Sequence, residues 1–230
     1  ASPARATTRA RCACSTATDT IATMFPRLLL ASCLLLPLSG QMLMMGETSE
    51  GFISLFNGQD LGQWEGDPAL WKIERGRIVG STEGVAPLKA NSFLVYHGGK
   101  YRDFELRLQM RLRNHNSGVQ FRSVESDGWA VKGLQADAAE GRFWGNLHDE
   151  GGRKLVVDGW TGKGERAVHA NDWNDYTIYC KGPLVRLTLN GVVTAEVNNE
   201  KPASGVIALQ LHAGPPMRVE FRNIRIRTFD

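Results

Sequence analysis

Apolar and polar side chains alternate with a period of two along much of the chain. The clearest case is residues 101–113, where one set of positions holds Phe104, Leu106, Leu108 and Met110, and the other holds Glu105, Arg107, Gln109 and Arg111. A strand places successive side chains on opposite faces, so the alternation favours a strand although length and propensity also suit a helix. Comparable patterns cover residues 173–182, 184–197, 204–214 and 217–227.

Turn signals separate these segments. Arg75-Gly76 and Asn190-Gly191 each lie between two apolar runs and predict tight hairpins. About a dozen short strands with a turn signal roughly every ten residues, and no convincing helix, are typical of an all-β sandwich or barrel. We therefore expect two antiparallel sheets whose apolar faces meet, with the polar faces left for solvent or a ligand.

Residues 114–153 predict two strands and a loop with unusual polar faces. Val119 and Phe121 alternate with Gln120 and Arg122, and Leu134 and Ala136 alternate with Gln135 and Asp137. Amides, a guanidinium and a carboxylate together make a surface that can hydrogen-bond a ligand, unlike the Lys, Thr and Glu of an ordinary solvent-exposed strand face. Further along the chain, Gln210 and His212 occupy equivalent polar positions. We expect these sets, with Glu105, to point outward from one sheet and to line its concave side.

The first 45 residues differ from the rest. Residues 1–23 are rich in Ala, Thr and Arg, and we interpret Met24 as the natural start. Arg27, the apolar run 28–38 and small residues near Gly40 resemble a secretory signal, and the run is too short to span a bilayer. We expect a secreted or periplasmic protein with cleavage near Gly40, a linker at 46–50 and one domain at 51–230. Cleavage and lipid attachment at Cys33 is the alternative.

Charge and cysteine content narrow the function further. Residues 1–45 carry four basic residues and one acidic residue, so the remainder holds 23 of each and is neutral. A neutral domain has no basic footprint for nucleic acid, and none is expected as a partner. Cys180 is the only cysteine after residue 45, so the domain cannot form an internal disulfide, and we interpret it as an inert buried thiol.

Several motifs in order resemble the 3-keto-disaccharide hydrolase domain family. They span residues 51–227 and read SLFNGQDLGQW, YRDFELRLQMRLRNHNSGVQFRS, LQADAAEGRFWGNLHDEGGR, DWNDYTI, LNGV and VIALQLHAGPPMRVEFRNIRI. The resemblance implies a concanavalin-like jelly-roll sandwich and an exported protein that cleaves glycosides carrying a ketone at C3. Gly133 and His148 depart from the family pattern, which often has Glu and Tyr at these places.

That chemistry needs a base near C2, donors at an enolate oxygen and an acid at the leaving oxygen. Asp137 or His212 is the expected base and Glu150 the expected acid. The substrate-binding candidates are Glu105, Gln120, Arg122, Gln135, Trp144, Arg153 and Gln210. Arg122 is the expected enolate stabiliser, and Trp144 is the expected ring beneath the sugar, with Trp129 and Trp160 as alternatives. No cofactor is expected. Asp137, Glu150, His148 and His212 could converge on a divalent metal, but no local spacing of ligands supports such a site, so metal binding is left open.

Other interpretations stand beside these. Asp137 can simply accept loop hydrogen bonds, Glu150 and Arg153 can form a loop ion pair, and residues 105–111 can be a solvated charge ladder. At the level of function, the same sandwich also suits a non-catalytic carbohydrate-binding module. A retaining β-glucanase needs two carboxylates about 5 Å apart, usually as E-x-D-x-E, but the string from Glu125 to Trp129 lacks the last acid.

Overall fold

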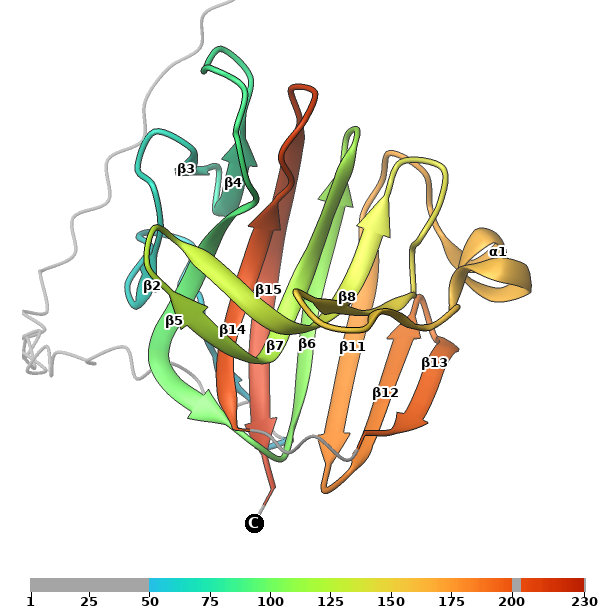
Figure 1. Cartoon of the computed structure of the whole chain (residues 1–230). Helices are drawn as coiled ribbons and strands as arrows, with labels where there is room; N and C mark the ends of the chain where they lie inside the picture. Colours follow the sequence, from blue (N-terminus) through green and yellow to red (C-terminus); the bar gives the residue numbers. More distant parts are fainter. Residues whose placement is uncertain (1–49, 200–203, 230) are drawn as a thin grey trace, which may run out of the picture. The chain divides into compact units, whose positions relative to one another are not determined.

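The computed structural model describes residues 50–199 and 204–229, which form two facing β-sheets (Figure 1). Sheet A contains β1 (Ile53–Ser54), β3 (Trp71–Glu74), β4 (Arg77–Ser81), β6 (Phe104–Leu112), β11 (Asn174–Lys181), β12 (Leu184–Leu189), β13 (Val192–Asn198) and β15 (Arg218–Thr228). Sheet B contains β2 (Trp64–Glu65), β5 (Ser92–Tyr101), β7 (Asn116–Ser126), β8 (Ala130–Ala139), β9 (Leu147–Glu150), β10 (Lys154–Val157) and β14 (Gly205–Leu211).

Both sheets are antiparallel throughout. Sheet A runs β13-β12-β11-β6-β15-β4-β3, with β1 also paired to β15, and sheet B runs β10-β9-β8-β7-β14-β5-β2. Strands adjacent in space are often distant in sequence, as with β6 and β15 or β7 and β14, so the chain crosses repeatedly between the layers. The predicted all-β sandwich of two antiparallel sheets is confirmed.

The apolar faces of the two sheets meet to form the core. Leu106 and Met110 of β6 are buried against residues of sheet B such as Phe121 and Leu209, all with no exposed surface. Removing one such side chain from water contributes about 1.5–3 kcal/mol to folding. The period-two alternation along β6 is therefore the period of burial, and the choice of strand over helix for these residues is confirmed.

Local turn chemistry matches the sequence at both predicted hairpins. Arg75 and Gly76 join β3 to β4 with φ of 51° and 73°, and Asn190 and Gly191 join β12 to β13 with φ of 46° and 82°. Two successive left-handed residues give the twist that a two-residue hairpin requires, and Asn and Gly adopt that conformation at low cost.

A bulge in β7 breaks the alternation that the sequence suggested. The pairing with β8 shifts between Phe121 and Val124, and Arg122 has φ of 48°. The extra residue turns Arg122 away from the face of Gln120, and Ser123 takes that place, with its Oγ donating to Gln120 Oε1 at 2.7 Å. The expectation that Gln120 and Arg122 share a face is wrong for this reason.

Three further expectations are corrected. Glu105 lies on β6, in sheet A, so it does not share a sheet with Gln120, Gln135 and Gln210. Where the sequence showed no convincing helix, the structure has a helical segment, Trp160–Gly164, followed by the short α1 (Glu165–Ala167), which lies beside β13 (Figure 1). The expected loop after β8 contains a third strand, β9.

The signal-like run, Met24, Cys33 and the linker up to residue 49 lie outside the described residues. Within the described part, no helix has the length and apolar character needed to cross a membrane. Cys180 of β11 is buried, and its burial raises the pKa of the thiol to about 12, as suits an inert structural cysteine.

Candidate functional site

The outer face of sheet B, which points away from the core, contains a polar cleft of about 370 Å³. It is lined by Asn116, Gln135, Asp137, Phe143, Asn146, His148, Glu150, Lys154, Leu155, Gln210 and His212. Strands β7, β8, β9 and β14 supply most of these side chains. The three expected catalytic residues, Asp137, Glu150 and His212, therefore meet in one cleft, although His212 is far from the other two in the chain.

Asp137 lies on β8 and is 6% exposed. Its Oδ1 accepts from Gln135 Nε2 and from the Ala138 backbone N–H, both at 3.2 Å. The pKa of this carboxyl is raised to about 7, chiefly by burial and to a smaller extent by the negative charge of Glu150, although the two hydrogen bonds act to lower it. A carboxyl that titrates near neutrality can take or release a proton, as general acid–base chemistry requires.

Three buried amides form a chain across three strands of sheet B. Gln120 of β7 donates through Nε2 to Gln135 Oε1 of β8 at 2.9 Å. Gln135 in turn donates through Nε2 to Gln210 Oε1 of β14 at 3.2 Å, as well as to Asp137. All three glutamines are at most 2% exposed. The chain links the base candidate to β14, the strand that leads to His212.

His212 follows β14 and is held by its neighbours. Its Nδ1 lies 2.6 Å from the Ala213 carbonyl oxygen, which can only accept, so Nδ1 carries the proton. In the neutral ring that leaves Nε2 as the free acceptor, the form in which an imidazole works as a base. The His115 ring packs edge-on against it, with centroids 5.0 Å apart.

Glu150 ends β9 and stands opposite Gly133 in the register of β8 and β9. Its Oε1 accepts from Asn91 Nδ2 at 3.0 Å, and Asn91 Oδ1 accepts from the Ala213 N–H at 2.9 Å. Asn91 thus ties the carboxylate to the loop that holds His212. Sequence reasoning missed Asn91, because nothing local to the chain marks an amide just before a strand as a link between two distant loops.

The aromatic ring of the cleft is Phe143, not Trp144. Trp144 is 5% exposed and stacks on Tyr176 in the core, with centroids 6.2 Å apart. Phe143 has φ of 66° and lines the cleft. The left-handed turn at Phe143 places adjacent residues on different sides, which alternation alone does not reveal. Lys154, which sequence reasoning also missed, adds a cation to the lining of the cleft.

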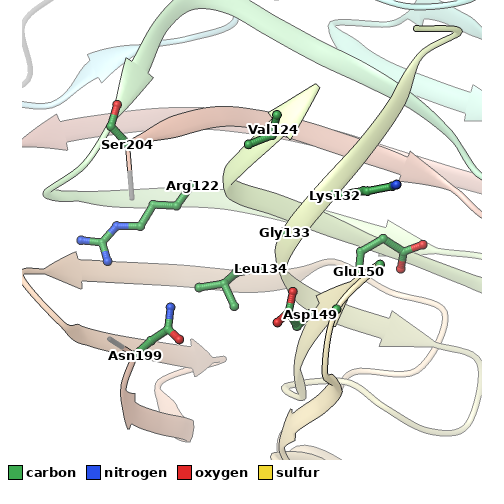
Figure 2. A pocket seen from close by; sticks show the side chains of 11 residues that line it. Arg122, Val124, Lys132, Gly133, Leu134, Asp149, Glu150, Asn199 and Ser204 are labelled. Carbon is green, nitrogen blue, oxygen red and sulfur yellow. The ribbon is translucent and has the colours of Figure 1, made fainter. Parts of the chain in front are cut away.

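Arg122 does not reach this cleft. Its guanidinium donates to the backbone oxygens of Arg102 (2.6 Å) and Gly182 (3.0 Å) and to Asp103 Oδ1 (3.0 Å). These partners are the turns between β5 and β6 and between β11 and β12, so the side chain joins the two sheets at one end of the sandwich. It lines a separate pocket of about 340 Å³, where it points away from Glu150 (Figure 2).

Two more binding candidates lie elsewhere. Arg153 donates to Asp149 Oδ2 at 3.0 Å and to Asn199 Oδ1 at 2.8 Å, so its ion pair is with Asp149 and not with Glu150. Glu105 accepts from Arg107 (2.6 Å) and Arg227 (2.8 Å) on the outer face of sheet A. The charge-ladder interpretation of residues 105–111 describes these ion pairs, although Glu105 itself is only 7% exposed.

Gly133, where the sequence departs from the family pattern, has a backbone conformation that only glycine adopts readily. Gly133 has φ of 144°, and a Cβ there would lie 2.5 Å from Ser123 Oγ, so a side chain at this place needs a different backbone.

Among residues 50–199 and 204–229, no three His, Cys, Asp or Glu side chains are arranged to hold a metal ion. His148 Nε2 lies 3.9 Å from Glu150 Oε2.

A family model described as the 3-keto-alpha-glucoside-1,2-lyase-like domain matches residues 51–227. The chain belongs to this family. Of the family motifs noted in the sequence, LQAD carries Gln135 and Asp137, LHDE carries His148 and Glu150, and LQLH carries Gln210 and His212. These six cleft residues therefore lie in two of the motifs that carried the resemblance, because LQAD and LHDE are the two ends of one continuous motif. No curated protein matches the chain at a significant level.

Solved structures similar to this lyase-like domain share its fold. A Parabacteroides distasonis ATCC 8503 protein, provisionally designated a glycosyl hydrolase, has a TM-score of 0.59 and 22% identity, over 79% of this chain and 95% of that one. Carbohydrate-binding module CBM66 of Bacillus subtilis has a TM-score of 0.54 and 13% identity, over 72% and 96%. A Bacillus licheniformis β-glucanase has a TM-score of 0.53 and 13% identity, over 77% and 97%.

The β-glucanase likeness extends to the fold alone. In this chain Glu125 contacts His97 at 2.9 Å, and Asp127 lies in the turn between β7 and β8 beside Trp129, away from the polar cleft. The paired carboxylates of a retaining glycosidase are therefore not assembled from this string. The domain is a glycosyl hydrolase-like or carbohydrate-binding jelly roll.

Proposed function

We propose that this domain cleaves glycosides whose C3 hydroxyl has been oxidised to a ketone. The proposal rests on one observation, the convergence of Asp137, Glu150 and His212 in a single cleft with Gln135 and Gln210. Family membership supports the substrate class. The cleft offers a base, an acid and amide donors, which are the three requirements of this chemistry.

The reaction follows from the acidity of the proton at C2, beside the ketone. A base removes this proton, and the electron pair of the C–H bond forms an enolate with C3. When the enolate collapses, the C1–oxygen bond breaks, a C1=C2 double bond forms and the leaving oxygen takes a proton from an acid. Addition of water across C1=C2, with hydroxyl to C1 and hydrogen to C2, completes hydrolysis.

We assign the base to Asp137 and the acid to Glu150, with His212 as the competing base. A buried carboxylate with a pKa of about 7 is a stronger base than an ordinary one and is matched to neutral pH. Arg122 has no part in this scheme, because it lies at the end of the sandwich. Positive charge for the enolate comes instead from Lys154, and hydrogen-bond donors come from the glutamine chain.

The test is incubation of the purified protein with a nitrophenyl 3-keto-glucoside and, in parallel, with the unoxidised glucoside. Release of nitrophenol from the ketone alone is expected. Asp137→Asn should abolish release, whereas Asp175→Asn, on an exposed side chain of sheet A, should not. In deuterated buffer, the wild type should also exchange the C2 proton. A protein that binds the ketone but neither exchanges this proton nor releases nitrophenol refutes the proposal.

A non-catalytic carbohydrate-binding module is the second candidate, and the fold shared with CBM66 supports it. A double Ala substitution at Asp137 and His212 separates the two functions. A module retains much of its sugar affinity, because the glutamines and Phe143 remain, whereas an enzyme loses turnover whatever its affinity.

We further propose that the protein acts after export, because the apolar run 28–38 has the character of a secretory signal. Mass spectrometry of the N-terminus of the protein from its native host tests this. A mature chain that starts near residue 41 supports ordinary cleavage, and a diacylated Cys33 supports lipid anchoring. A chain that retains residues 24–40 contradicts export.

A further inference from the structure

Two buried polar atoms that belong to cleft residues have no hydrogen-bond partner among residues 50–199 and 204–229. They are Asn116 Oδ1 and Gln210 Nε2, on the neighbouring strands β7 and β14. Buried polar groups in folded proteins are nearly always paired, so an acceptor and a donor left unpaired in one cleft need an explanation. A ligand that brings a complementary acceptor and donor supplies it.

The donor character of Gln210 is set by its neighbours. An ionised Asp137 can only accept, so Gln135 presents its NH₂ group to Asp137 and to Gln210 Oε1. Gln210 must then direct its own NH₂ away from Gln135. At the other end, Gln120 donates to Gln135 Oε1 while its own Oε1 accepts from Ser123. The whole chain therefore runs in one direction.

Gly118 makes this chain possible. It lies on β7 between Gln135 of β8 and Gln210 of β14, directly opposite Asp137 in the register. A Cβ at Gly118 would lie 2.6 Å from Gln135 Cγ and Cδ and 2.7 Å from Nε2. The Gln135 side chain thus passes over the bare backbone of β7 to reach the next strand but one, and any larger residue at 118 closes that path.

We propose that Asn116 and Gln210 recognise an α-hydroxy ketone. Gln210 Nε2 donates to the ketone oxygen, and Asn116 Oδ1 accepts from the hydroxyl on an adjacent carbon. Gln120 and Gln135 are positioning residues that act through Gln210. This inference rests on the proposed function, and it names the feature of the substrate that the cleft distinguishes.

The selectivity has a chemical basis. A ketone oxygen carries no proton, so a donor satisfies it completely, whereas the hydroxyl of an unoxidised sugar brings a proton that needs an acceptor of its own. The acceptor at hand, Asn116 Oδ1, would have to accept from this hydroxyl as well as from the adjacent one. As the ketone becomes an enolate, its oxygen gains negative charge, and the hydrogen bond from Gln210 strengthens.

Calorimetric binding of 3-keto-glucose and glucose tests the inference, because 3-keto-glucose lacks a glycosidic leaving group. The wild type should prefer the ketone by about 10- to 100-fold, the range for one buried hydrogen-bonding group. Gln210→Leu should bring this ratio close to one. Asn116→Leu should weaken both sugars, and Asn116→Asp, which keeps the acceptor, should bind better than Asn116→Leu.

The positioning residues have their own controls. Gly118→Ala displaces Gln135, and Gln120→Met removes one amide while keeping the length of the side chain, so both should lower the ratio without loss of glucose binding. Gln109→Met removes an amide from the outer face of sheet A and should leave the ratio unchanged. Urea unfolding identifies any variant that is destabilised, and the remaining variants then decide.

The outcomes separate this inference from the proposed function. A protein that cleaves 3-keto glycosides while Gln210→Leu keeps the full selectivity overturns the inference and leaves the activity standing. A protein that cleaves no 3-keto glycoside, yet binds 3-keto-glucose in a Gln210-dependent manner, supports the recognition of the ketone and refutes the proposed enzymatic activity. Equal binding of both sugars by the wild type overturns the inference.

Discussion

Asp137→Asn is expected to stabilise the protein in a pH-dependent way. In the folded protein, burial raises the pKa of Asp137 from 3.8 to about 7. A carboxyl with a raised pKa lowers the stability of the fold as pH increases, because the unfolded chain releases the proton near pH 4 and the folded chain retains it until near pH 7. Asn has the same shape and carries no charge, so it removes this penalty.

The size of the effect follows from the two pKa values. Each unit of pKa shift corresponds to about 1.4 kcal/mol. As pH rises from about 5 to about 8.5, the titration of Asp137 therefore lowers the free energy of unfolding by about 3 kcal/mol. The stability advantage of Asp137→Asn over wild type should therefore be larger at pH 8.5 than at pH 5 by on the order of 3 kcal/mol. Asn keeps an oxygen that accepts from Gln135 and Ala138, so both hydrogen bonds survive the substitution.

Urea unfolding of wild type and Asp137→Asn at the two ends of this pH range measures the difference. Asp175→Asn, which removes a carboxylate on the exposed face of sheet A, is the matched control and should show little change between the same pH values. A gain for Asp137→Asn that is the same at both pH values would refute the reasoning, because it would mean that Asp137 titrates alike in the folded and unfolded chains.

Three other predictions concern the site and its supports. If Asp137 is the base, kcat/KM for a 3-keto glucoside should rise as pH passes about 7, and Asp137→Asn should lose at least about 100-fold at every pH; a profile with no rise near pH 7 assigns the base elsewhere. Arg122→Gln should cost about 2–4 kcal/mol in urea unfolding, because it leaves turn carbonyls and Asp103 unpaired, without changing KM; a raised KM at normal stability would place Arg122 in substrate binding. Gly133→Ala should lower the melting temperature far more than Gly128→Ala, since both have positive φ but only Gly133 has neighbours in the way; equal losses would show that steric overlap with Ser123 is relieved.

Most of the fold was predictable because the signals that specify it are local. The alternation in β6 follows from burial of one face, and the hairpins at Arg75-Gly76 and Asn190-Gly191 follow from backbone preferences of two residues. Short pieces escaped this reasoning. β2 and β9 have two and four residues, too few for a period to be visible, and their strand character depends on pairing with β5 and β8.

The candidate site divides in the same way. Asp137, Glu150 and His212 were selected by residue type and by their place in the family motifs, and the structure brings them together. Arg122 was misplaced because a bulge adds one residue to β7 and reverses the face on which the later side chains of the strand lie. Glu105 was misplaced because alternation indicates a face and does not indicate a sheet.

The sequence by itself determined an all-β sandwich, the family of the domain and the polar residues that compete for a role. These depend on periodicity and on motifs a few residues long, which are properties of the chain before it folds. Only the tertiary structure decided which polar faces lie together, that Phe143 and Asn91 belong to the cleft and its supports, and that Gln135 crosses Gly118 to reach Gln210. The physical reason is that strands adjacent in a sandwich are distant in sequence, so the long-range pairing of β7 with β14 carries information that no local pattern contains.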